Sequence, residues 1–299
     1  MKVLLATDGS ESSEGAASFL TRMAWSPDDS ITVFHAVYAV PFHYDEKFYW
    51  TTLQSIKKEC APKILDSAVA ILKPVRASIS VEIEEGTLHP CTPEQCIIKA
   101  AEASGMDLIV MGARGTKGLA SVFIGSVSRA VVNNAANPVL IVTQQPAVPS
   151  DRMRVLFAAD GSDHSRATAE FLTSLPFPDT TELTIMHVIP SNFLDVSERF
   201  VLEIDERVKD AVASIRSREF TEAERIIEQA RGYLGRKFKQ IHVLSRIGDP
   251  PTEILKAAES MEADLVAVGR RGARGTQGAL GSVSRNILNH ASCSVLIVR

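Results

Sequence analysis

The chain has 299 residues, of which 45% are hydrophobic and 23% are charged, and its formal net charge is −4 at pH 7. Domains usually hold about 100–200 residues, so this length predicts two domains, and the composition supplies enough apolar residues for two cores. The slightly negative charge, without a run of basic residues, argues against nucleic acid as the main partner, because phosphate backbones require clustered Lys and Arg.

The cysteines and the start of the chain bear on its location. Cys60, Cys91, Cys96 and Cys293 are scattered and have no metal-ligand spacing, so we expect reduced thiols and no metal site. The opening stretch MKVLLATDGS turns polar too soon for a signal peptide. No apolar run approaches the ~18 residues of a membrane span. The expectation is a cytoplasmic protein that does not contact membranes.

The predicted elements alternate between strands and helices. In chain order they are a strand at 2–7, a helix at 11–24, a strand at 31–37, a helix at 46–73, a strand at 77–84, a helix at 93–104, a strand at 107–111, a helix at 126–136 and a strand at 138–142. This alternation implies parallel strands with helices on both faces, and runs such as KVLLAT and DLIVMG are apolar throughout, as doubly buried strands should be.

The second half of the chain repeats the first. KVLLATDGSESSEGAASFL returns as RVLFAADGSDHSRATAEFL, which places Asp160 152 residues after Asp8, and GSVSRAVVNNAANPVLIV (125–142) returns as GSVSRNILNHASCSVLIV (281–298). Two copies of about 150 residues indicate a domain duplication, because solenoid repeats span only roughly 20–50 residues. We therefore predict an α/β protein with two doubly wound parallel-sheet domains, 1–143 and 153–299, joined by the proline-containing linker 144–152.

The stretch GARGTKGLASVFIGSVS (112–128) follows a predicted buried strand and is rich in glycine. In doubly wound sheets, ligands bind beyond the carboxyl ends of the strands, and glycines allow the backbone to approach them. Gly125-Ser126 then opens a helix, and a helix N-terminus suits phosphate. Asp8, at the end of the first strand, can accept hydrogen bonds from a nucleoside. The spacing alone leaves open that the glycines only form turns and that the serines only cap the helix.

The motif resembles that of a known family. Gly112-Ala113-Arg114-Gly115, nine further residues and then Gly125-Ser126 match the pattern G-x2-G-x9-G-[ST] of ATP-binding universal stress proteins. TDGS after the first strand, FHAV in the second and NPVLIV at the last are also similar to that family, and the resemblance covers both halves. It implies a tandem universal stress protein with two five-stranded Rossmann-like sheets of strand order 3-2-1-4-5. It also implies ATP between the ends of the first and fourth strands, with Mg²⁺ left open.

The resemblance also implies which residues hold the nucleotide. In the first half these are Ala6, Asp8 and Ala36 toward the adenine and ribose, Met111, Gly112, Arg114 and Gly115 toward the ribose and phosphates, and Gly125, Ser126, Val127 and Ser128 around the triphosphate. Their counterparts in the second half are Ala158, Asp160, Val188, Val268, Gly269, Arg271, Gly272, Gly281, Ser282, Val283 and Ser284. Only eight residues separate Gly272 from Gly281, so whether the second loop still surrounds a triphosphate stays open.

Three functions compete. The favoured one is an ATP-binding, nucleotide-dependent regulatory module of a stress response. The alternatives are a slow ATPase or nucleotide-transferring enzyme that uses the same pocket, and a nucleotide-free interaction protein. No general base accompanies the glycine stretch, so no catalytic residue is expected, and we interpret His35 and His187, at matching places in the repeats, as hydrogen-bonded structural residues.

The last predicted strand of each half is apolar and lies at the edge of its sheet, so we expect another strand to pair with it. An exposed apolar edge strand invites pairing, and single-domain chains of the family that this sequence resembles dimerise through these strands. We therefore expect 138–142 and 294–298 to pair inside one chain, with separate nucleotide pockets, and a homodimer is also allowed.

Overall fold

The computed structural model describes all residues except 38–46, 86–90, 115–123, 144–151, 191–205 and 273–279. The elements of the first half are β1 (Lys2–Ala6), α1 (Glu11–Thr21), β2 (Ser30–Val37), α2 (Lys47–Leu72), β3 (Ser78–Glu85), α3 (Pro93–Ala103), β4 (Leu108–Gly112), α4 (Ser126–Asn134) and β5 (Val139–Val142). Those of the second half are β6 (Arg154–Ala158), α5 (Asp163–Ser174), β7 (Glu182–Pro190), α7 (Glu206–Leu234), β8 (Gln240–Gly248), α8 (Pro250–Ser260), β9 (Leu265–Gly269), α9 (Ser282–His290) and β10 (Ser294–Val298).

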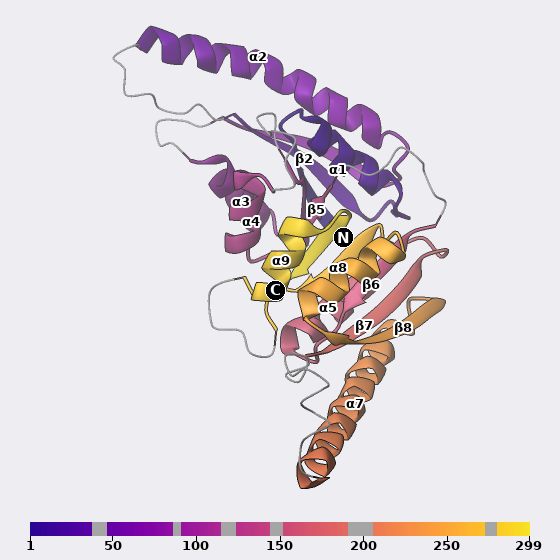
Figure 1. The fold of residues 1–299 in the computed structure, drawn as a ribbon. Helices are drawn as coiled ribbons and strands as arrows, with labels where there is room; N and C mark the ends of the chain where they lie inside the picture. Colours follow the sequence, from indigo (N-terminus) through magenta and orange to yellow (C-terminus); the bar gives the residue numbers. More distant parts are fainter. Residues whose placement is uncertain (38–46, 86–90, 115–123, 144–151, 191–205, 273–279) are drawn as a thin grey trace.

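The strands form one continuous sheet (Figure 1), in the order β3-β2-β1-β4-β5-β10-β9-β6-β7-β8. The strands within each half are parallel, which confirms the doubly wound α/β fold and the predicted strand order 3-2-1-4-5. At the centre, β5 and β10 run antiparallel, with Leu140 opposite Leu296. The two halves therefore share one sheet, with β3 and β8 at its outer edges.

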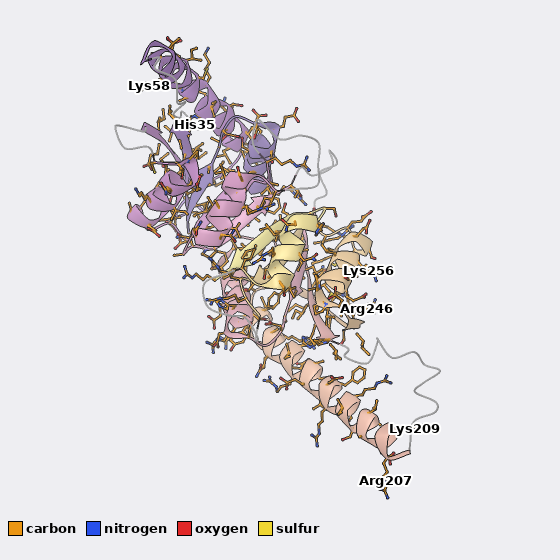
Figure 2. The ribbon with its side chains drawn as sticks, turned by 60° about the vertical axis from the view of Figure 1, so that its left-hand side comes forward. His35, Lys58, Arg207, Lys209, Arg246 and Lys256 are labelled. Carbon is orange, nitrogen blue, oxygen red and sulfur yellow. The ribbon has the colours of Figure 1, made fainter. Side chains whose placement is uncertain are left out.

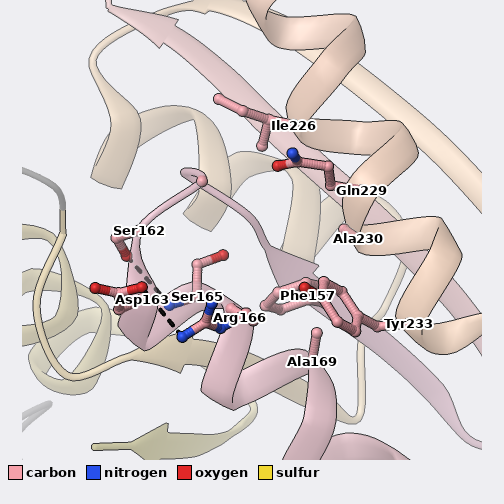
Figure 3. Close-up of a pocket in the computed structure, with 11 residues that line it drawn as sticks. Phe157, Ser162, Asp163, Ser165, Arg166, Ala169, Ile226, Gln229, Ala230 and Tyr233 are labelled. Carbon is pink, nitrogen blue, oxygen red and sulfur yellow. Dashed lines mark hydrogen bonds and ion pairs between the residues drawn. The ribbon is translucent and has the colours of Figure 1, made fainter.

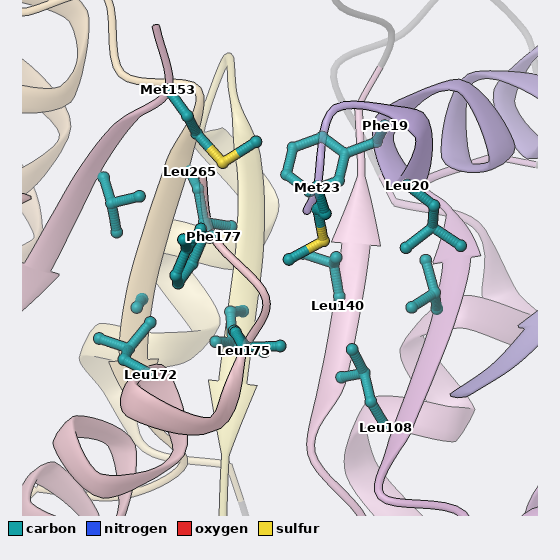
Figure 4. Packing of buried hydrophobic residues seen from close by; sticks show 14 of the residues in the cluster. Phe19, Leu20, Met23, Leu108, Leu140, Met153, Leu172, Leu175, Phe177 and Leu265 are labelled. Atoms are coloured by element: carbon teal, nitrogen blue, oxygen red, sulfur yellow. The ribbon is translucent and has the colours of Figure 1, made fainter. Parts of the chain in front are cut away.

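Helices cover both faces of the sheet. The first hydrophobic cluster joins residues of α1, α2, α5 and α7 to one face, and the second joins residues of α3, α4, α8 and α9 to the other. Both clusters continue across the β5–β10 pair. Figure 4 shows Phe19, Met23 and Leu140 of the first half beside Leu175 and Phe177 of the second, in the first of these clusters. Burial on both faces explains why β4 and β5 are apolar at every position before the final glycine of β4.

Polar contacts also join the halves. Arg22, the C-cap residue of α1, donates from Nη1 to Asp264 Oδ1 at 2.9 Å, and both side chains are about four-fifths buried. The backbone N–H of Ala24 donates to the carbonyl of Pro176 at 2.7 Å. The sequence predicts a helix to 24, but α1 ends at Thr21, because the chain turns at Arg22. The Leu20 carbonyl accepts there from the Met23 N–H at 3.2 Å and from the Trp25 indole at 2.6 Å.

The long helices α2 and α7 extend beyond the sheet (Figures 1 and 2), and Figure 2 places Arg207 and Lys209 at the far end of α7. Among the described helices, which include these two, none combines the length and the apolar character that crossing a membrane requires.

Candidate functional site

The turn between β1 and α1 fixes the Asp8 carboxylate. Asp8 Oδ1 accepts hydrogen bonds from the Ser10 backbone N–H at 3.1 Å and from the Ser10 hydroxyl at 2.6 Å. Gly9 between them has φ +76°, a left-handed conformation that favours glycine. The Ser10 hydroxyl also accepts from the Ser13 N–H and caps α1. The sequence TDGS therefore builds a turn that holds the acidic group at the carboxyl end of β1.

The first glycine of the motif is required by packing. A Cβ on Gly112 would lie 2.5 Å from the carbonyl carbon of Ser12, so only glycine lets β4 end against the start of α1. Just beyond it, the Arg114 N–H donates to Ser12 Oγ at 3.1 Å, and the Ser10 hydroxyl approaches the Arg114 carbonyl at 3.4 Å. These contacts bring the segment after β4 next to Asp8. Gly115 lies outside the described residues.

The N-terminus of α4 completes the first site. Its N-cap is Gly125, so no side chain caps the helix. The Gly125 N–H donates to the Ala113 carbonyl at 2.7 Å, and the buried Ser128 hydroxyl donates to the Gly112 carbonyl at 2.8 Å. The Ser128 hydroxyl is therefore used inside the protein. The first turn of α4 offers a ligand its N–H groups, which have no partner within the helix, and the exposed side chain of Ser126.

The remaining predicted residues of the first half line the same end of the sheet. Ala6 is paired with Met111 across the β1–β4 ladder, and both are nearly fully buried in the second hydrophobic cluster. Ala36 and Val127 pack against that cluster. The structure thus gathers the described candidates where β1, β2 and β4 end and α4 begins, as the sequence predicted for residues that lie far apart in the chain.

The second half repeats this arrangement. Asp160 Oδ1 accepts from the Ser162 N–H at 3.0 Å and from its hydroxyl at 2.6 Å. A Cβ on Gly269 would lie 2.9 Å from the His164 carbonyl carbon, and one on Gly272 would lie 2.6 Å from Asp160 Oδ2. The second glycine of this motif therefore lies directly beside the carboxylate.

The start of α9 matches the start of α4. Its N-cap is Gly281, again without a capping side chain, and the Ser284 hydroxyl donates to the Gly269 carbonyl at 2.7 Å. Ser282 is exposed. The other candidates of this half, Ala158, Val188, Val268 and Val283, lie in or against the second hydrophobic cluster, as their counterparts do.

The second site carries more basic residues than the first. His164, Arg270 and Arg299 stand where the first half has Ser12, Ala113 and Thr143. Burial lowers the pKa of His164 below its usual value, and the positive charge of Arg271 lowers it further. Burial, followed by Arg299 and Arg271, also lowers the pKa of Arg270. The guanidinium groups of Arg270, Arg271 and Arg299 therefore lie close enough for their charges to interact, while the lowered pKa of His164 favours its neutral form.

Two histidines support the acidic turns. The Nδ1 atom of His35 donates to the Thr7 carbonyl at 2.8 Å, and that of His187 donates to the Ala159 carbonyl at 2.7 Å. A carbonyl only accepts, so both rings carry their hydrogen on Nδ1. The prediction that these histidines are hydrogen-bonded structural residues is confirmed, and each holds the residue that precedes Asp8 or Asp160.

A cavity of about 150 Å³ lies between α5 and α7 (Figure 3). Phe157, Ile226 and Tyr233 line it, together with Arg166, which pairs with Asp163 at 3.3 Å. In the first half, the hydrogen bond from Ser67 to Glu14, at 2.7 Å, joins α2 to α1 at the corresponding place. The cavity is smaller than the roughly 300–1,000 Å³ of small-molecule sites, and it borders the first hydrophobic cluster on the face opposite α9. Gly161 and Ser162 also line it, so the cavity borders the turn that holds the Asp160 carboxylate of the second half.

Within the described ranges, no three His, Cys, Asp or Glu side chains gather as a metal-ligand set. The four cysteines are free thiols, and Cys96 and Cys293 are buried. Burial raises the pKa of the Cys293 thiol to about 11, which keeps it protonated and unreactive near neutral pH.

The fold and the site together define a tandem Rossmann-like α/β protein, in which each half places an acidic turn, a glycine segment and an uncapped helix N-terminus at one edge of the sheet. The model of the Universal stress protein family matches residues 1–143 and again residues 152–299, so the chain belongs to the universal stress protein family, in a two-domain form.

Relatives match along the whole chain or along one half. A universal stress protein of Mycolicibacterium smegmatis is 25% identical over 303 aligned positions, covering 99% of this chain and 96% of the relative. A shorter one from Thermus aquaticus is 35% identical over 140 positions, covering 47% of this chain and 96% of its own length. The crystal structure of a universal stress protein from Archaeoglobus fulgidus has a TM-score of 0.66 and 24% identity, and the match covers 100% of this chain and 98% of that one, which supports the fold.

Proposed function

We propose that this universal stress protein binds ATP at the carboxyl edge of the sheet and acts as a nucleotide-dependent regulatory module of a stress response. One observation carries the proposal. The helices α1, α5 and α8 begin with side-chain caps from Ser10, Ser162 and Asp249, whereas α4 and α9, the two helices that follow the glycine segments, have only glycine at the N-cap. Their first N–H groups are left for an anion, and the helix dipole favours negative charge there.

The acidic turn supports a nucleoside as the other part of the ligand. The Asp8 carboxylate is fixed by Ser10 and lies beside the segment that leads from Gly112 to α4. A ligand with hydroxyl groups at one end and phosphates at the other fits this order of groups, because a carboxylate accepts from hydroxyls while N–H groups donate to phosphates. In the second half, Asp160 and the start of α9 offer the same order of groups, with Arg271 as the counterpart of Arg114 and His164 in the place of Ser12.

The regulatory role rests on the chemistry of the site. The described groups around Gly112 and Gly125 can bind and orient a triphosphate, and the acidic group beside them, Asp8, already accepts two hydrogen bonds from Ser10. A slow ATPase is the alternative that uses the same pocket, and phosphate release at stoichiometric enzyme concentration tests it. A cytoplasmic location belongs to the proposal and is supported by four free thiols.

Substituting the N-cap glycines tests the proposal. We expect Gly125→Val to abolish ATP binding in the first half and Gly281→Val to abolish it in the second, because a branched side chain would occupy the space before the N–H groups. Gly232→Val is the matched control, since a Cβ at that position in α7 meets nothing within 4 Å. Calorimetric titration with ATP and the nucleotide content of acid extracts measure the effect. Unchanged ATP affinity in folded Gly125→Val and Gly281→Val proteins would refute the site.

A further inference from the structure

Arg270 connects the two halves through its side chain. It directly follows β9 in the glycine segment of the second half, yet only 5% of it is exposed. Its Nη1 donates to the Ala135 carbonyl at 2.9 Å, and its Nη2 donates to the Asn133 carbonyl. Both carbonyls belong to the C-terminus of α4, in the first half. A guanidinium at this position supplies donors to the terminal carbonyls and places positive charge at the negative end of the helix dipole.

The backbone of the same residue belongs to the second site. The Arg270 carbonyl accepts from the N–H of Gly281, the N-cap of α9, at 2.9 Å, and also from the Ser284 hydroxyl at 3.2 Å. The Arg270 N–H donates to the Val298 carbonyl at 2.6 Å, in β10. A ligand that shifts residues 269–272 or the N-cap Gly281 therefore moves a residue whose side chain holds α4.

The first half lacks a reciprocal contact. The residue equivalent to Arg270 is Ala113, whose carbonyl accepts from Gly125 at 2.7 Å but whose methyl group cannot donate to the end of α9. Arg129 makes a polar contact across the same boundary, with Asn289 Oδ1 at 3.5 Å, but its side chain is exposed and comes from α4 itself. Among the residues of the two glycine segments that the structure describes, a side-chain connection to the opposite helix is thus seen from the second half alone.

We propose that Arg270 is a positioning residue that couples the two nucleotide sites, so that a nucleotide in the second half changes the affinity of the first half. The inference rests on the proposed function, because α4 carries at its other end the N–H groups assigned to phosphate. The coupling is direct: the second glycine segment, the Arg270 guanidinium, the last turn of α4 and the first turn of α4 form one chain of contacts. Because binding free energies are linked, a nucleotide in the first half changes the affinity of the second by the same factor.

Calorimetric titrations with ATP measure the coupling. The affinity of the first site with the second site empty comes from Gly281→Val, and its affinity with the second site filled comes from the two-step isotherm of the unmodified protein. We expect the two affinities to differ by about fivefold or more, within the usual range for coupled sites. Arg270→Ala should bring the ratio close to one, while Arg129→Ala, which removes the other polar contact across this boundary, should leave it unchanged.

A swap variant separates coupling from a general loss of stability. Arg270→Ala combined with Ala113→Arg moves the guanidinium to the pseudo-symmetric position, facing the carbonyls at the end of α9, and should restore a ratio different from one. A ratio of one in the unmodified protein, with both sites binding, would overturn the coupling and leave the proposed function intact. Absence of ATP binding at both sites would overturn the proposed function instead.

A second readout does not need nucleotide. Hydrogen exchange of the amides in the last turn of α4 should become faster in Arg270→Ala than in Arg129→Ala, because the Asn133 and Ala135 carbonyls lose their donors. Equal exchange in the two variants would show that Arg270 does not hold α4, and the inference would fail whatever the nucleotide titrations give.

Discussion

At the residue scale, each site depends on a carboxylate that its own turn holds in place. Asp8 and Asp160 each accept from the N–H and the hydroxyl of the serine two residues later, at almost the same distances in the two halves. The agreement follows from the shared sequence DGS, in which glycine supplies the positive φ and serine supplies both donors. The acidic group is therefore preorganised before any ligand arrives.

We expect Asp8→Ala to weaken ATP binding in the first half through the nucleoside end. Each lost hydrogen bond to a charged acceptor costs about 1.5–3 kcal/mol, or roughly a 10- to 150-fold loss of affinity. Calorimetry of the Gly281→Val background isolates this site. The exposed Asp28 provides the control substitution, Asp28→Ala. If inorganic triphosphate loses as much affinity as ATP does, Asp8 does not contact the nucleoside.

At the scale of elements, glycines set how closely helices approach strands. The sequence motif was interpreted as a site of ligand approach, and the structure gives two of its glycines a packing reason as well, since Gly112 and Gly269 lie against the first turns of α1 and α5. The glycines of the motif therefore serve the packing of the fold as well as the predicted ligand site. Gly272 differs from these two, because a Cβ added to it would meet the Asp160 carboxylate rather than the backbone of a helix.

We expect Gly112→Ala to destabilise the protein by about 1–3 kcal/mol, the usual cost of overpacking, because the new methyl group would meet Ser12 backbone atoms that cannot move aside. Gly15→Ala in α1 is the matched control. Its methyl group meets nothing within 4 Å, and alanine is better than glycine in a helix by about 0.5–1 kcal/mol, so this variant should gain stability. Urea unfolding monitored by circular dichroism measures both changes. A Gly112→Ala protein as stable as the unmodified one would contradict the packing explanation.

At the scale of the whole molecule, the β5–β10 ladder makes one sheet out of two. Ile141 and Ile297 are almost fully buried in it, and the hydrophobic clusters on both faces continue across it. The outer edge strands are more exposed than this central pair, since Val81 on β3 is 57% exposed and Val243 on β8 is 47% exposed. The apolar strands at the centre are thus covered by each other.

We expect the double variant Ile141→Lys with Ile297→Lys to separate the halves or to aggregate, because burying two unpaired ammonium groups is strongly unfavourable. Val81→Lys with Val243→Lys introduces the same charges at the exposed outer edges and should remain a folded monomer or keep the oligomeric state of the unmodified protein. Light scattering after size-exclusion chromatography, together with limited proteolysis of the segment between the halves, compares the two. A double Ile variant with unchanged mass, stability and protease resistance would show that the ladder does not hold the halves together.

The sequence by itself determined the class of fold, the duplication and the family. These conclusions rest on local features of the sequence: the alternation of strand and helix patterns, the apolar strands expected to be buried on both faces, and the repeated DGS and GSVS stretches. Each can be recognised without knowing which parts of the chain are in contact. Asp8, Gly112 and Gly125 could be predicted as neighbours because the carboxyl ends of parallel strands share one edge of a sheet.

Only the tertiary structure decided the contacts that join distant segments. It showed that the Ser128 hydroxyl is used by Gly112, that Gly112 is required by the approach of α1, and that Arg270 of the second half holds the end of α4 in the first. In the sequence, Arg271 aligns with the motif residue Arg114, whereas Arg270 aligns with Ala113 and nothing in the sequence indicates a role for it. What distinguishes Arg270 is its burial and its contact with a carbonyl 135 positions earlier in the chain, and both arise when β10 pairs with β5.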